Sequence, residues 1–232
     1  MAHALHTLNE NEHKDYKVSL DRQFNHAAEQ HLIPIMTDEI FDAALEFPLV
    51  VVKNSETGAF TLCAIQGLKP ETNLYCGREQ YDAIYVPRAL RLYPFALREN
   101  AQTQQLEICI IDDPARVGVE SGEALFDAEG NKSQFLEQQI KLLKSHTEMA
   151  GQTMQLMNLL EHYELLHAQA INIKTGSEEI SFDGIYVINQ QKLNTLAPDV
   201  LVKLRDNGAL ALIYAIQQSL KQINRLIVRT HG

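Results

Sequence analysis

The feature that most constrains the fold is a long helical pattern between Ser133 and Leu166. Apolar or aromatic side chains recur there every seven residues, at Phe135, Leu142, Met149, Leu156 and Tyr163. This spacing places them on one face of an α-helix, and that face has to be covered by other elements. The pattern therefore predicts one long helix near residues 133–166, packed against strands or further helices.

Short apolar runs bounded by turn residues predict strands on both sides of this helix. The runs before it lie at 49–52, 60–65 and 106–111, and the runs after it lie at 171–174, 179–182 and 185–188. The last three suggest a meander. A helix that starts at Pro198 and ends at an Asn207–Gly208 cap precedes a C-terminal helix over about 209–228. Because hairpins and helices are mixed and do not alternate, the order favours an α+β fold.

A short helix is expected just before the first hairpin. Thr37 supplies a capping hydroxyl, and Asp38 and Glu39 place two carboxylates at the positive end of a helix over 40–45. Its apolar residues share one side: Phe41, Ala44 and Leu45.

Length and charge limit the classes of function. With 232 residues, 45% of them hydrophobic, the chain can bury one sizeable core. We expect a single domain over 17–232, preceded by a polar, His-rich segment over 1–16 that forms a tail or is loosely attached. The net charge of -10 disfavours binding to nucleic acid or to anionic membranes.

The compartment and the absence of a cofactor are also expectations from the sequence. The three cysteines are widely spaced and the N-terminus resembles no signal peptide, so we expect a cytoplasmic protein with reduced thiols. Glu164 and His167 form one Glu-x-x-His pair of the kind found in di-iron bundles, but the second such pair, Glu10 and His13, lies outside any convincing helix. We therefore expect no metal and no cofactor. Asp112 and Asp113, which leave a strand before Pro114, fit a turn cap better than a cation site.

The densest cluster of tyrosine and arginine lies between Asn73 and Phe95, and Arg98 follows it. Rigid aromatic rings and guanidinium groups suit a surface that contacts a protein or peptide. The predicted contact residues are Asn73, Tyr81, Tyr85, Arg88, Arg91, Tyr93 and Arg98.

Two other interpretations of the same residues stay open. The tyrosines can fill the core while Arg91 forms a salt bridge. Alternatively, Arg88 or Arg91 binds a small anionic ligand, with Asp112 or His146 handling protons in an enzyme.

Several motifs in the same order resemble the bacterial SapC family. They include Asn73-Leu74, the segment Tyr85-Val86-Pro87-Arg88-Ala89-Leu90-Arg91-Leu92-Tyr93-Pro94-Phe95, and Asp183-Gly184-Ile185-Tyr186-Val187-Ile188. Many relatives have Trp shortly before the Tyr-Ile-Pro segment, where this chain has Tyr81.

The resemblance implies a soluble accessory protein without established catalytic residues. The family takes its name from a gene at a surface-layer locus. Its members are often encoded beside flavin-dependent halogenase-like proteins and cupin-like oxygenases, which are therefore the implied partners. A homodimer through the same tyrosine and arginine residues is the other arrangement that we expect.

Overall fold

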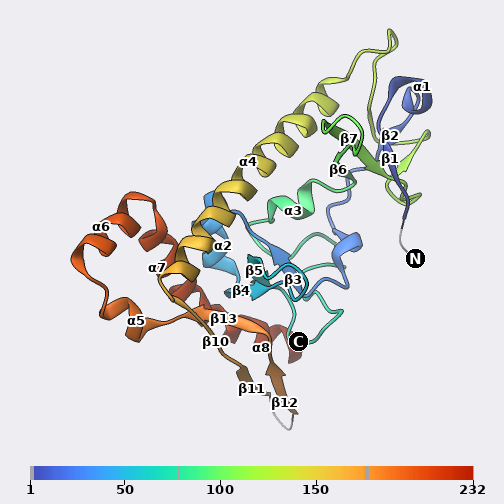
Figure 1. Cartoon of the computed structure of the whole chain (residues 1–232). Coiled ribbons are helices and arrows are strands. Elements are labelled where there is room, and N and C mark those ends of the chain that lie inside the picture. The colour runs from blue at the N-terminus through green and yellow to red at the C-terminus, as the bar shows by residue number, and fades with distance from the viewer. Residues whose placement is uncertain (1–2, 78, 176–177, 232) are drawn as a thin grey trace. The chain divides into compact units, whose positions relative to one another are not determined.

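The chain is divided into two compact units. The single domain expected over 17–232 stays a prediction. The structure, a computed structural model shown in Figure 1, describes residues 3–77, 79–175 and 178–231. Unit 1 consists of Met1–Arg22 and Leu90–Glu148, and unit 2 of Gln23–Ala89 and Met149–Gly232. The long helix α4 (Gln134–His162) starts in unit 1 and ends in unit 2.

Unit 1 is built on two small antiparallel sheets. The first has the order β1 (Leu5–Thr7), β7 (Leu106–Ile111), β6 (Phe95–Glu99). The second has the order β8 (Val117–Gly118), β2 (Lys17–Val18), β9 (Glu123–Ala124). Strand β1 pairs with β7 and is followed by α1 (Glu10–His13), so most of the expected N-terminal tail is part of the fold.

The core of unit 1 lies between these strands and the first turns of α4. Alternate residues of β6 and β7 face the helix because side chains in a strand point to opposite faces in turn. The buried cluster contains Phe95 and Ile110 from the strands, Leu136 and Leu143 from α4, and Leu125 from the intervening loop.

Unit 2 contains a five-stranded antiparallel sheet. Its order is β10 (Leu166–Ala168), β13 (Ile185–Ile188), β4 (Leu49–Lys53), β5 (Phe60–Ile65), β3 (Leu32–Pro34). The strands β11 (Ile171–Thr175) and β12 (Glu178–Phe182) form a separate hairpin. The predicted meander of the last three strands is therefore wrong, because β13 pairs with β10 and β4 and not with β12.

Unit 2 also contains several helices, of which the one over Ala209–Ser219 packs on the sheet. The 3₁₀ turns η1 (Asn25–Ala27) and η2 (Thr37–Glu39) precede α2 (Ile40–Glu46). The short helix α3 (Arg88–Arg91) has its first two residues in unit 2 and its last two in unit 1. After the strands come α5 (Gln190–Asn194), α6 (Pro198–Asp206), α7 (Ala209–Ser219), η3 (Leu220–Gln222) and α8 (Ile223–His231). Helix α7 contacts α2, β4 and β13 (Figure 1).

The α+β class, the long helix and the C-terminal helix are confirmed. Helix α4 begins one residue after the predicted start and ends four before the predicted end. Pro198 occupies the first turn of α6, and Gly208 adopts a φ of 77° between α6 and α7, as expected for a left-handed cap. The predicted C-terminal helix is interrupted by η3.

A buried serine links helix α7 to the sheet of unit 2. The hydroxyl of Ser219 accepts a hydrogen bond of 2.9 Å from the backbone N–H of Leu49, the first residue of β4. The same hydroxyl donates to the carbonyl of Ile216 over 2.7 Å. Since Ser219 and Leu49 are both buried, water does not replace this bond.

We predict that Ser219→Ala lowers the free energy of unfolding by about 1–3 kcal/mol, because it leaves the buried N–H of Leu49 without an acceptor. Urea unfolding measures the loss. Gln218→Ala changes the exposed neighbour on the same helix and serves as the control. Equal stability of the two variants would contradict this role of Ser219.

Candidate functional site

The first predicted contact residue, Asn73, lies in the interior of unit 2. It is buried, its side-chain amide donates to Gln66 over 2.7 Å, and its oxygen accepts from the backbone N–H of Tyr75 over 2.9 Å. These contacts hold the loop that leads into the tyrosine-rich stretch. Asn73 is therefore not part of an exposed contact surface.

Tyr81 is also an interior residue. Its ring stacks on the ring of Tyr75 with centroids 5.9 Å apart, and Phe24 meets it edge-on at 5.5 Å. On Tyr75, the guanidinium of Arg229 lies 4.3 Å from the ring centroid. Burial raises the pKa of Tyr75 to about 12, so this phenol stays protonated. Tyr81 therefore fills the core, as one of the two alternative interpretations expects, and its ring is not exposed to a partner.

Tyr85 and Arg88 meet at a buried carboxylate that sequence reasoning did not assign to the site. Glu39 is only 2% exposed. One of its oxygens accepts from the hydroxyl of Tyr85 and, over 2.7 Å, from the backbone N–H of Arg88. The other accepts from the backbone N–H of Met36 over 3.2 Å. The acceptor at this helix start is thus Glu39 and not the predicted Thr37, whose own N–H donates to Thr153.

The guanidinium of Arg88 forms an ion pair with Asp38, which precedes Glu39 in η2. Burial opposes the charge of Arg88, but the hydrogen bond and the charge of Asp38 prevail and raise the pKa of Arg88. Because Arg88 and Tyr85 contact adjacent residues, the segment that carries them is fixed at the N-terminal end of α2.

The outer face of α2 carries two exposed apolar side chains. Phe41 is 64% exposed and Leu45 is 68% exposed, and they lie one helical turn apart. The inner face of the same helix is buried through Ile40, Ala43 and Glu46. The sequence correctly places Phe41 and Leu45 on one side, but that side faces outward.

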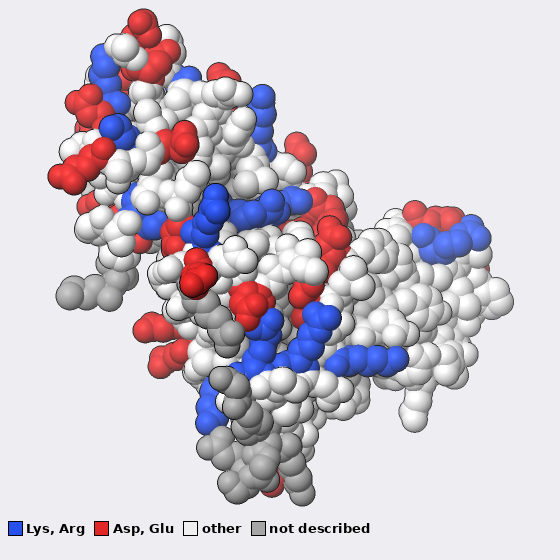
Figure 2. Space-filling view, turned by 180° about the vertical axis from the view of Figure 1, so that it is seen from behind, with Lys and Arg blue, Asp and Glu red and all other residues white. Residues whose placement is uncertain are grey.

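Charged residues border this apolar face. At one end is the Asp38–Arg88 pair; at the other, Arg225 donates to the carbonyl of Leu45 over 3.3 Å and pairs with Glu46 at 3.1 Å. On the face drawn in Figure 2, several basic side chains likewise lie beside acidic ones. We call Phe41 and Leu45, with the half-exposed Arg225 at their border, the α2 surface.

The remaining predicted contact residues belong to unit 1. The hydroxyl of Tyr93 donates to Asp113 over 2.7 Å, and the guanidinium of Arg116 lies 5.8 Å from the Tyr93 ring centroid. Partial burial opposes ionisation of Asp113, but the bonds from Tyr93 and the backbone N–H of Ala115 lower its pKa. The bond to Ala115 confirms the predicted turn cap at this aspartate.

Arg91 and Arg98 are exposed on unit 1. Arg98 donates to the hydroxyl of Thr7 over 2.7 Å and lies 3.7 Å from a carboxylate oxygen of Glu107, its cross-strand neighbour. The predicted set is therefore divided: Asn73, Tyr81, Tyr85 and Arg88 lie in unit 2, and Arg91, Tyr93 and Arg98 lie in unit 1.

The predicted ligand site with Asp112 or His146 draws on both units. Arg88 belongs to unit 2, whereas Arg91, Asp112 and His146 belong to unit 1. Asp112 lines a cavity of about 280 Å³ with His6, Glu12, His13, Tyr16, Ile110 and Val117, a set that includes neither Arg91 nor His146.

Two wider properties concern the part of the chain that the structure describes. No group of three or more His, Cys, Asp or Glu side chains there is arranged to hold a metal ion. None of its helices combines the length and the apolar character needed to cross a lipid bilayer.

Sequence reasoning missed Glu39, Phe41 and Leu45 as members of the site. The sequence did contain a signal for the apolar pair. Phe41 and Leu45 are spaced one helical turn apart, shortly after the carboxylates of Asp38 and Glu39. Nothing in the sequence shows that Glu39 is reached by Tyr85 and Arg88, which lie more than forty positions further along.

These elements define an α+β protein of two compact units, one of which presents an exposed apolar helix face. The chain belongs to the SapC family, whose model matches residues 8–226. No curated protein and no solved structure matches the chain.

We predict that Glu39→Gln lowers the free energy of unfolding by about 2 kcal/mol, because hydrogen bonds to a charged acceptor are the stronger kind and three donors converge here. Chemical unfolding measures the loss. Asp42→Asn neutralises an exposed carboxylate on the same helix and is the matched control. If both variants unfold at the same denaturant concentration, Glu39 does not hold this segment.

Proposed function

We propose that this SapC-family protein is a non-enzymatic accessory protein that binds a partner protein through the α2 surface. The main support for the proposal is the exposure of Phe41 and Leu45. They are 64% and 68% exposed on a helix whose opposite face is buried. Leaving two large apolar side chains in water is unfavourable, and a partner that covers them recovers that free energy.

The composition of the α2 surface supports a protein partner. Interface centres are rich in aromatic residues and arginine, and they are surrounded by a polar rim. Here Phe41 and Leu45 supply the centre, while Arg225, whose side chain is 52% exposed, supplies a guanidinium group at the border.

The shape of α2 indicates what the partner presents. Helix α2 has only seven residues and offers two projecting side chains. Such side chains fit into an apolar pocket of a partner, as hot-spot residues do. The partner is therefore a folded protein with an apolar pocket. The flavin-dependent halogenase-like and cupin-like oxygenase proteins suggested by the family resemblance are the first candidates.

The positions of the arginines favour this function over the ligand-binding alternative. Arg88 already pairs with Asp38, and its backbone N–H is bound by Glu39. The Arg88 side chain is only 12% exposed, and its Nε and Nη1 atoms are buried, so the guanidinium offers little surface to a small anion from solvent.

The test replaces Phe41 with a photo-crosslinking phenylalanine analogue in the native cell. The crosslinked protein is identified, purified and titrated against the wild-type chain and Phe41→Ser/Leu45→Ser by calorimetry. We expect the double variant to bind about 100-fold or more weakly, since buried anchor residues contribute several kcal/mol. Its thermal stability stays close to that of the wild type because both side chains are exposed.

The matched control is Val202→Ser/Tyr214→Ser, which removes two other exposed apolar side chains of unit 2, 45% and 55% exposed. This control binds like the wild type. Unchanged affinity of the Phe41/Leu45 variant, or crosslinks only to a second copy of the chain, would refute the proposal.

A further inference from the structure

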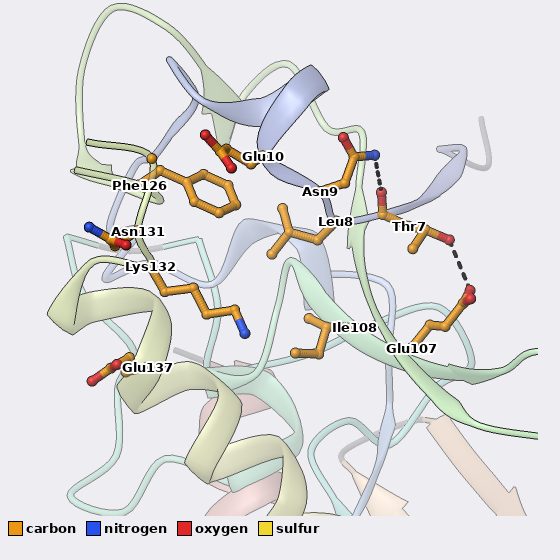
Figure 3. A pocket seen from close by; sticks show the side chains of 11 residues that line it. Thr7, Leu8, Asn9, Glu10, Glu107, Ile108, Phe126, Asn131, Lys132 and Glu137 are labelled. Carbon is orange, nitrogen blue, oxygen red and sulfur yellow. Dashed lines mark hydrogen bonds between the residues drawn. The ribbon is translucent and has the colours of Figure 1, made fainter. Parts of the chain in front are cut away.

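Unit 1 contains a second candidate site that is independent of the α2 surface. It is a cavity of about 560 Å³, within the range of pockets that hold small organic ligands. Strand β1, the start of α1, strand β7, the 126–132 turn and the first turn of α4 supply its lining (Figure 3).

The inner part of this cavity is apolar. The side chains of Leu8, Ile108 and Phe126 line it and also pack against the core of unit 1. In Figure 3 they surround the space into which the Lys132 side chain extends. Apolar surface of this kind favours a ligand with a hydrocarbon portion.

The backbone holds Lys132 in place. Lys132 forms an antiparallel bridge with Phe126, and within the turn the N–H of Asn131 donates to Asp127 over 2.8 Å. Among the described residues, the side chain of Lys132 has no hydrogen-bond or ion-pair partner, so its ammonium group is available to a ligand.

Of the three carboxylates around the cavity, Glu107 is already compensated. It accepts from Thr7 over 3.1 Å and from Asn100 over 2.6 Å, and Arg98 lies 3.7 Å away. Its charge therefore offers little to a cation in the cavity.

The other two carboxylates lie at the edge. The carboxylate of Glu10 lies against Gly130. A Cβ atom added to that glycine would be only 1.9 Å from a carboxylate oxygen, so only glycine leaves room for Glu10 there. Figure 3 shows Glu10 beyond the Phe126 ring, and Glu137 on α4 turned away from the apolar side chains. The charge that extends into the apolar part is the ammonium of Lys132.

We propose that this cavity binds a small amphipathic carboxylate, with its hydrocarbon chain against Leu8, Ile108 and Phe126 and its carboxylate on Lys132. The ligand class follows from one unpaired cation beside an apolar wall. Binding involves no covalent step. The site lies within unit 1 and does not depend on the function proposed for the α2 surface.

The probe is octanoate, titrated into the full chain by calorimetry, with octanamide and octylammonium as neutral and cationic counterparts. We expect octanoate to bind and both counterparts to bind at least about tenfold more weakly, which corresponds to about 1.4 kcal/mol. Lys132→Met weakens octanoate about tenfold and leaves octanamide unchanged, and Lys132→Arg restores octanoate binding.

The matched control is Lys144→Met, an exposed lysine of α4 outside the cavity, which binds octanoate like the wild type. Amide chemical shifts that change on titration should map to Thr7, Leu8 and Ile108. The proposal is overturned if octanoate does not bind at millimolar concentration, if octylammonium binds more tightly, or if Lys132→Met binds octanoate as the wild type does.

Discussion

A buried carboxylate orients the proposed interaction surface. Glu39 is almost fully enclosed, and an enclosed carboxylate is stable only when donors replace the water that it has lost. Met36, Tyr85 and Arg88 provide them. Because the donors come from the residue before the η2 turn and from a segment more than forty positions away, one side chain fixes both the start of α2 and the Tyr85–Arg88 segment. The buried face of α2 is then set by Ile40 and its neighbours, so that Phe41 and Leu45 have to face solvent.

The two units carry different kinds of candidate site. Unit 2 offers a convex pair of apolar side chains that suits a protein partner, whereas unit 1 offers a concave cavity with a lysine that suits a small carboxylate. In both units, arginines near the candidate site form ion pairs with neighbouring carboxylates. Arg88 pairs with Asp38 in unit 2, and Arg98 pairs with Glu107 in unit 1. The groups left without a partner identify the two candidate sites. They are the exposed side chains of Phe41 and Leu45 in unit 2 and the ammonium group of Lys132 in unit 1.

Local patterns predict the elements better than their partners. The period of the apolar residues identifies α4 to within a few positions, and Pro198 and Gly208 mark helix ends, because helical geometry and caps depend on neighbouring residues. Pairing of β13 with β4 joins residues more than a hundred positions apart, and no local signal specifies it.

The same limit affects the prediction of the candidate site. Tyrosine and arginine between Asn73 and Arg98 mark an important region, but their types do not show that Tyr81 is buried, that Tyr85 reaches Glu39, or that the stretch crosses from one unit to the other.

The exchange rate of the Arg88 amide hydrogen tests the role of Glu39 most directly. Arg88 begins the one-turn helix α3, where the first amide has no acceptor within the helix, so its protection depends on the carboxylate. Residue-resolved hydrogen exchange by NMR should show this amide exchanging about 100-fold or more slowly than the amide of the exposed loop residue Ile84. An Arg88 amide that exchanges as fast as that of Ile84 would contradict the account.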